Sequence, residues 1–135
     1  MARLKEIVVD SWHPARLAKF WAAVLDEFEV APYDADENAR LAALGRTPDT
    51  DPSVCLQGPG LQIYFQEPER QMEFQGRLHL DIVGASRDEE VERLVALGAT
   101  IAATHAEYTK MRDPEGNEFC VQDPAPTEPE VTTAP

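Results

Sequence analysis

The sequence predicts an α+β fold, and three observations support that class. Strand-like and helix-like segments alternate along most of the 135 residues. The order strand, helix, strands occurs twice, which is a weak internal repeat. The second repeat ends in a segment typical of a β-hairpin, residues 108–122. Because 43% of the residues are hydrophobic, a chain of this length can bury its own core as one domain.

The first repeat contains four strand-like segments, at residues 7–9, 28–33, 53–57 and 61–66. Its first helix begins at Pro14, a residue that suits the first helical position. That helix has an apolar stripe at helical spacing, formed by Leu17, Phe20, Trp21, Val24 and Leu25. We expect Trp21 to anchor the core. A second helix at 36–44, with Gly45 as its C-terminal cap, is either a lid over a cavity or a surface insertion.

The second repeat also contains four strand-like segments, at residues 78–83, 99–103, 108–112 and 118–122. Its helix follows Ser86, which forms a predicted capping box with Glu89. The turn of the last hairpin is DPEGN, residues 113–117, in which the proline presets φ and the glycine accepts positive φ. Alternation then places Phe119 and Val121 on the core face and Cys120 on the opposite face.

These segments together resemble a glyoxalase-like domain of the vicinal oxygen chelate superfamily, which includes glyoxalase I, the bleomycin resistance proteins and the extradiol dioxygenases. The similar segments are, in chain order, EIVVDSWHPARLAKFWAAVL, LQIYFQEPE, RLHLDIV, ALGA and DPEGNEF. The resemblance spans residues 4–123, and its specificity comes from the ordered set. It implies two βαβββ-type modules that form a half-open curved sheet around a cavity, with the helices outside.

On this basis we expect one glyoxalase-like domain at residues 1–123. Its first module would occupy about 4–67, a linker 68–76, and its second module about 77–123. Residues 124–135 are rich in proline, threonine and glutamate with little to bury, so we expect a disordered tail. Superfamily members of this size usually pair, so the resemblance also implies a homodimer.

The net charge of −13, from 12 basic and 25 acidic residues, limits the partners. It opposes binding to nucleic acid and to anionic membrane surfaces. The chain has no apolar run long enough to span a membrane, no recognisable signal peptide and only two cysteines. We therefore expect a cytoplasmic protein. The acidity itself has two interpretations: a well-solvated surface, or acidic walls that attract a cationic ligand.

In metal-binding members of the superfamily, the ligands come from the first and last strands of each module. The matching positions here are Glu6, Gln66 (with Tyr64 on the same face), His79 and Cys120. The last position usually holds a carboxylate. Hard cations prefer oxygen ligands, whereas a thiolate selects zinc or copper, so this set is chemically inconsistent. We predict no bound metal and no cofactor, and an iron dioxygenase is disfavoured.

His79 and Asp81 share one strand face and are the candidate catalytic pair. The alternative is a histidine that faces a polar cavity and is satisfied by its neighbours. The candidate ligand-binding residues are Glu6, Asp10, Trp12, Tyr64, Gln66 and Cys120. Trp12 either lines the mouth of a pocket or caps the core. Cys120 is more typical of a small buried hydrophobe than of a nucleophile.

Two functions remain open for a cavity between the modules, where we expect a small molecule to bind. One is a lyase or isomerase, in which His79 and either Asp10 or Asp81 move a proton next to a carbonyl. The other is a non-catalytic protein that sequesters a drug or metabolite, as the bleomycin-resistance branch does. Trp12, Tyr64 and the acidity favour the second function, and the histidine–aspartate pair favours the first.

Overall fold

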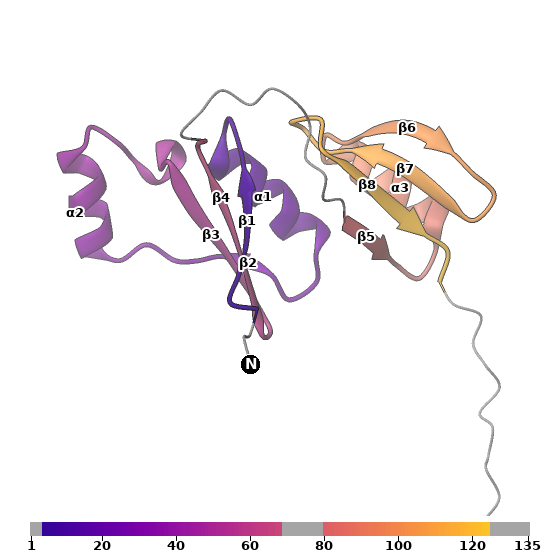
Figure 1. Cartoon of the computed structure of the whole chain (residues 1–135), viewed down its shortest axis with the longest axis horizontal. Helices are drawn as coiled ribbons and strands as arrows, with labels where there is room; N and C mark the ends of the chain where they lie inside the picture. The colour runs from indigo at the N-terminus through magenta and orange to yellow at the C-terminus, as the bar shows by residue number, and fades with distance from the viewer. Residues whose placement is uncertain (1–3, 69–79, 125–135) are drawn as a thin grey trace, which may run out of the picture.

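The computed structural model describes residues 4–68 and 80–124, and these residues form two four-stranded sheets and three α-helices (Figure 1). The predicted α+β class is confirmed. Residues 69–76 of the expected linker, the expected tail from residue 125 onward and His79 lie outside the described residues. No helix within 4–68 and 80–124 is long and apolar enough to cross a membrane.

The first sheet has the strand order β1-β4-β3-β2, with β1 parallel to β4 and the other pairs antiparallel. Its strands are β1 (Ile7–Asp10), β2 (Glu29–Val30), β3 (Ser53–Gly58) and β4 (Leu61–Gln66). Its helices are α1 (Pro14–Val24), α2 (Ala35–Ala43) and the short 3-10 helix η1 (Pro48–Thr50). We call these elements the first module.

The second sheet repeats this topology in the order β5-β8-β7-β6, with β5 parallel to β8. Its strands are β5 (Leu80–Val83), β6 (Thr100–Thr104), β7 (Tyr108–Arg112) and β8 (Glu118–Gln122). Its helix is α3 (Arg87–Ala96), capped by Ser86, which accepts a hydrogen bond from the Glu89 amide. We call these elements the second module, and the internal repeat is thereby confirmed.

The strands of both sheets bury one face against the helices. Buried side chains alternate along the strands, as expected for sheets with one covered face. The buried set is Val54, Leu56, Ile63 and Phe65 in the first sheet and Thr109, Met111, Phe119 and Val121 in the second. The core positions predicted for the last hairpin are therefore confirmed.

Helix α1 contributes to the core of both modules. Trp21 is 4% exposed, and its ring meets that of Phe119 in β8 at a centroid distance of 5.1 Å and an interplanar angle of 70°. Its indole Nε1 donates to Asp113 Oδ2 at 3.2 Å, so the polar edge of the ring is satisfied. Phe20 lies 6.4 Å from the same phenylalanine ring. Trp21 is thus the core anchor that was predicted, and it links the two modules.

The second module also forms hydrogen bonds with the C-terminal end of α1. Arg93 in α3 donates from Nη1 to the carbonyl of Ala23 at 2.6 Å and from Nη2 to that of Val24 at 3.0 Å. Carbonyls in the last turn of a helix lack partners within the helix, and a cation is favoured there by the helix dipole. Arg93 therefore caps a helix of the other module.

The segment expected as a strand at 28–33 is shorter in the structure. Only Glu29 and Val30 pair with β3, followed by one further hydrogen bond from the Ala31 amide to the Cys55 carbonyl. Pro32 has no amide hydrogen and cannot extend the ladder. Residues 46–52, between α2 and β3, contain η1.

Helix α2 lies at the end of the first module that is farthest from the second module (Figure 1). Its N-terminal cap is Asp34, which accepts a hydrogen bond from the Glu37 amide at 2.8 Å. Gly45 ends the segment with φ of 70°, as predicted for a left-handed cap. Leu41 is the buried residue of this helix.

Candidate functional site

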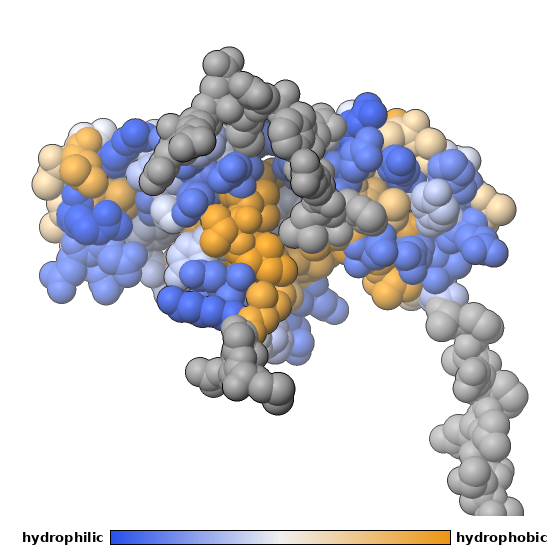
Figure 2. Space-filling model, in the orientation of Figure 1, coloured by the Kyte–Doolittle hydropathy of each residue, from blue (hydrophilic) through white to orange (hydrophobic). Residues whose placement is uncertain are grey.

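Each sheet has an open face, opposite the face that packs on the helices, and several of the predicted site residues lie there. The open face of the first sheet carries Val8, Asp10, Cys55, Tyr64 and Gln66, and that of the second carries Asp81, Val83, Lys110, Cys120 and Gln122. Helices α1 and α3 lie behind the strands in the view of Figure 1. Figure 2 shows an apolar strip over β1 and β4, where Val8 is 47% exposed.

Tyr64 stands at the middle of the open face of the first sheet. Strand register places it between Val8 on β1 and Cys55 on β3. A hydrogen bond with the Cys55 side chain raises the pKa of Tyr64, and the negative potentials of Cys55 and Glu6 and partial burial raise it further. The phenol is therefore neutral at physiological pH and available as a hydrogen-bonding group.

Glu6 and Gln66, two predicted ligand positions, are separated along this sheet. The parallel register places Gln66 opposite Asp10, whereas Glu6 precedes β1, four residues before Asp10. At about 3.3 Å per residue, the two positions are about 13 Å apart along the strand. Glu6 instead lies close enough to Tyr64 to act on its pKa. The structure thus groups Glu6 with Tyr64, and Asp10 with Gln66.

The open face of the second sheet carries a row of three functional groups. Register places Cys120 on β8 between Asp81 on β5 and Lys110 on β7. Partial burial raises the pKa of the Cys120 thiol, Asp81 raises it further, and Lys110 opposes the shift. The thiol is therefore protonated at neutral pH. His79, the other half of the predicted pair, lies outside the described residues.

Two cations share one carboxylate beside this row. Glu118 lies 3.8 Å from the Lys110 ammonium and 3.5 Å from the Arg112 guanidinium. All three side chains are substantially exposed, so these pairs contribute little to stability. The edge of the open face therefore carries both positive and negative side chains.

Trp12 does not cap the core, which was one of its two predicted roles. Its side chain is 51% exposed, in the loop between β1 and α1. Its backbone is fixed, because its amide donates to Glu115 Oε1 at 2.6 Å. The other predicted role, at the mouth of a ligand pocket, stays a prediction.

Three of the four positions that match metal ligands in the superfamily lie among the described residues, and they do not suit a divalent ion. Glu6 and Gln66 are about 13 Å apart along the strand pair, and a thiol at Cys120 does not match the oxygen ligands that hard cations prefer. Within residues 4–68 and 80–124, no group of three or more His, Cys, Asp or Glu side chains is arranged to hold a metal. Since His79 is not among those residues, the absence of metal stays a prediction.

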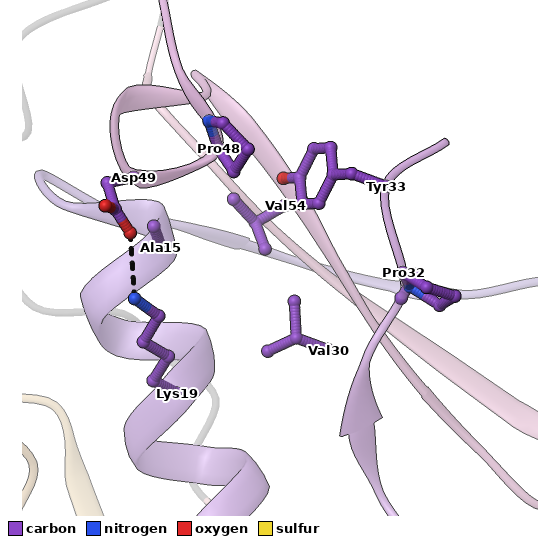
Figure 3. Close-up of a pocket in the computed structure, with 9 residues that line it drawn as sticks. Ala15, Lys19, Val30, Pro32, Tyr33, Pro48, Asp49 and Val54 are labelled. Atoms are coloured by element: carbon purple, nitrogen blue, oxygen red, sulfur yellow. Dashed lines mark hydrogen bonds and ion pairs between the residues drawn. The ribbon is translucent and has the colours of Figure 1, made fainter. Parts of the chain in front are cut away.

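A pocket that the sequence did not suggest lies on the helix side of the first sheet (Figure 3). Its volume is about 310 Å³. Its mainly apolar walls include Ala15, Val30, Pro32, Tyr33, Pro48 and Val54. Val54 points into this pocket while the next residue, Cys55, points to the open face, so β3 separates the two regions. The lining comes from α1, from residues 30–33, from η1 and from β3, and only tertiary structure brings these four segments together.

Known structures share this fold. An enzyme of the glyoxalase/bleomycin resistance protein/dioxygenase family from Burkholderia phytofirmans PsJN has a TM-score of 0.66 and 16% identity, covering 90% of this chain and 98% of that one. The fosfomycin resistance protein FosX from Mesorhizobium loti has a TM-score of 0.61 and 12% identity, with 90% and 91% covered. Lactoylglutathione lyase from Agrobacterium tumefaciens has a TM-score of 0.55 and 14% identity, with 91% and 94% covered.

At these identities the likeness shows the fold alone, and no curated protein sequence matches the chain significantly. The family relationship comes from the sequence itself, which matches the glyoxalase-like domain over residues 6–122. That match covers most of the chain and includes every element from β1 to β8. The chain therefore belongs to the glyoxalase-like domain family of the vicinal oxygen chelate superfamily.

Proposed function

We propose that this protein binds a small organic molecule on the open faces of its two sheets. The observation that carries the proposal is the contrast between the two faces of each sheet. The helix faces are almost wholly apolar and carry the buried core, whereas the open faces present hydrogen-bonding groups such as Tyr64, Gln66 and Cys120. A few placed polar groups beside exposed apolar surface are typical of small-molecule sites.

The protonation states of these groups indicate the kind of ligand. Tyr64 and Cys120 both have raised pKa values, so each retains a proton at neutral pH. A neutral phenol or thiol can donate a hydrogen bond to a carbonyl or carboxylate oxygen. We infer that the ligand carries such oxygen atoms. Two structural neighbours, a fosfomycin resistance protein and a lactoylglutathione lyase, are also named for small molecules.

A second candidate function is proton transfer next to a carbonyl, as in a lyase or isomerase. The observation that favours it is Asp81, an exposed carboxylate on the open face, adjacent in register to the protonated Cys120 thiol. In this proposal Asp81, with His79, removes the proton from carbon, and a neutral donor stabilises the oxygen on which negative charge develops.

A ligand screen tests the binding proposal. Thermal shifts with small oxygenated metabolites and aromatic cations identify ligands, and calorimetry then measures their affinity. Tyr64→Phe removes one donor, so we expect affinity to fall about two- to tenfold. Asp88→Asn, an exposed side chain at the start of α3, is the control and should leave the affinity unchanged. Equal affinities of Tyr64→Phe and wild type for every ligand would contradict the proposed site.

The same ligands distinguish catalysis from sequestration. An enzyme should turn over a bound ligand. Asp81→Asn and His79→Ala should each abolish this turnover but still bind the ligand. Tight binding without turnover would support sequestration.

We also propose that the protein forms a homodimer. Strand β6 is an edge strand of the second sheet, and Ile101 on it is 52% exposed. An edge strand has unpaired backbone groups that can pair with a second copy. Light scattering at micromolar concentration should give twice the chain mass, and a monomer mass would refute the proposal.

A further inference from the structure

The pocket on the helix side of the first sheet, which we call the rear pocket, has the size and the walls of a second ligand site. Its volume of about 310 Å³ lies at the lower end of the range of about 300–1,000 Å³ that is usual for small-molecule pockets. It lies between α1, the segment that follows β2, and η1 (Figure 3). Since β3 separates it from the open face, it is distinct from the site proposed above.

The walls are apolar and rigid. Ala15 and Val54 are buried core residues, and Pro32 and Pro48 have a fixed φ. The Tyr33 ring is held in place because its hydroxyl donates to Asp51 Oδ2 at 2.7 Å. Asp51 is itself 4% exposed and also accepts the Ser53 amide at 3.0 Å. An aromatic ring is thus locked into the wall by a buried carboxylate.

The pocket also contains one ion pair, between α1 and η1. The Lys19 ammonium lies 2.8 Å from Asp49 Oδ1 (Figure 3). Both side chains are mostly exposed, at 65% and 77%, so the pair is weak and can exchange partners. Either a ligand cation could replace Lys19, or a ligand anion could replace Asp49.

Charge decides between these two exchanges. The protein carries a net charge of −13, which attracts cations and repels anions. The Asp51 carboxylate lies at the hydroxyl end of the Tyr33 ring, and the ring face itself favours a nearby cation. We propose that this pocket binds a small primary amine with an apolar body. The ligand ammonium takes the place of the Lys19 ammonium beside Asp49, and the apolar body fills the space between Tyr33 and the prolines.

Three probes that share a benzyl or phenyl body and differ in charge test the proposal: benzylamine, benzyl alcohol and benzoate. Each is titrated into the full chain and followed by amide NMR shifts. Benzylamine should bind tightest and benzoate weakest, with the largest shifts at Ala31, Tyr33 and Val54. Tightest binding by benzoate, or equal binding by all three, would overturn the proposal. So would shifts centred on Tyr64 and Cys120, which would place the amine on the open face instead.

Two variants act in opposite directions. Lys19→Ala removes the resident cation, so benzylamine should bind about three- to tenfold tighter. Asp49→Asn removes the carboxylate, so the preference for benzylamine over benzyl alcohol should disappear. Asp88→Asn, an exposed acid at the start of α3, is the matched control and should leave the preference unchanged. An unchanged preference in Asp49→Asn, with dispersed amide spectra showing a folded protein, would overturn the proposal.

The result is separable from the function proposed for the open faces. Cys55 and Cys120 both lie on the open faces, so their alkylation rates report occupancy there. Benzylamine in the rear pocket should leave both rates unchanged. Failure of the amine to bind would therefore not contradict the open-face proposal. Failure to find a ligand on the open faces would likewise not contradict the amine site in the rear pocket.

Discussion

The carboxylate of Glu115, in the turn between β7 and β8, accepts a hydrogen bond from the Ser11 hydroxyl at 2.6 Å, across 104 residues of sequence. The same side chain accepts the Trp12 amide at 2.6 Å and the His13 amide at 3.3 Å. These groups precede and begin α1, where free amides and the helix dipole favour an anion. The second module therefore caps the N-terminus of α1 in the first.

The turn that presents Glu115 is shaped by Asp113. One carboxylate oxygen of Asp113 accepts the amides of Glu115 and Asn117, each at 2.9 Å. Its other oxygen accepts the Trp21 indole and the Asn117 side-chain amide. The DPEGN turn therefore does two things: Asp113 fixes its shape, and Glu115 attaches it to the other module.

Removal of the Glu115 carboxylate should destabilise the whole domain. Glu115→Ala leaves the buried Ser11 hydroxyl and the Trp12 amide without their acceptor, so we expect a loss of about 1–3 kcal/mol. Glu92→Ala, which removes an exposed acid in α3, is the matched control and should change stability by less than about 0.5 kcal/mol. Urea unfolding measures both, and equal midpoints for the two variants would contradict this role.

Removal of Arg93 should weaken the opposite end of α1. The glutamine of Arg93→Gln has no charged guanidinium that donates to both the Ala23 and Val24 carbonyls. We therefore expect the free energy of unfolding to fall by about 1–2 kcal/mol. Arg16→Gln, on the exposed side of α1, serves as the control. Because both modules depend on α1, each variant should shift a single cooperative transition. Two separate transitions would show that the modules unfold independently.

The hydrogen bond between Tyr33 and Asp51 predicts an alkaline effect on stability. Burial, together with Asp51, raises the pKa of Tyr33, so the folded state holds this proton more tightly than the unfolded state. The contribution of the protonated Tyr33 to the free energy of unfolding is complete below about pH 10, the usual pKa of tyrosine in an unfolded chain. It is lost as the pH rises towards the higher pKa of the folded state. The difference in free energy of unfolding between wild type and Tyr33→Phe, measured by urea unfolding, should therefore become smaller from pH 8 to pH 10.5. A constant difference would show that the phenol titrates alike in both states.

Protein purified without chelator should carry no stoichiometric metal. The separation of Glu6 from Gln66, and the mixture of a carboxylate, an amide and a thiol at Glu6, Gln66 and Cys120, leave too few matched donors. Elemental analysis and a calorimetric metal titration measure this. Near one equivalent of zinc, iron, nickel or manganese, lost in His79→Ala, would contradict the prediction and favour metal-assisted catalysis.

Local signals predicted much of this fold. Alternation in β8 placed Phe119 and Val121 in the core and Cys120 on the other face, and all three are found so. The bounds of β4, β7 and β8 match the predicted segments, because the turns between them have strong residue preferences. Side-chain period and turn chemistry depend only on nearby residues, so they can be read directly from a sequence.

Other features depend on contacts between distant residues, and sequence patterns do not encode these. The parallel register of β1 and β4 separates Glu6 from Gln66, which only the pairing itself reveals. The rear pocket depends on Lys19 and Asp49, 30 residues apart, meeting at 2.8 Å. The early end of β2 had a local cause, Pro32, that outweighed the apparent strand pattern.

Ligand protection of the two native cysteines tests the proposed binding site most directly. Cys55 lies on the open face of the first sheet and Cys120 on that of the second, so each thiol reports on one sheet. Alkylation of each cysteine is followed by peptide mass spectrometry, with and without a saturating concentration of the tightest ligand from the screen. A ligand on the open faces should slow alkylation of at least one cysteine severalfold, and Tyr64→Phe should weaken this protection. Unchanged alkylation rates at both cysteines, with the ligand bound, would place the site elsewhere and contradict the proposed function.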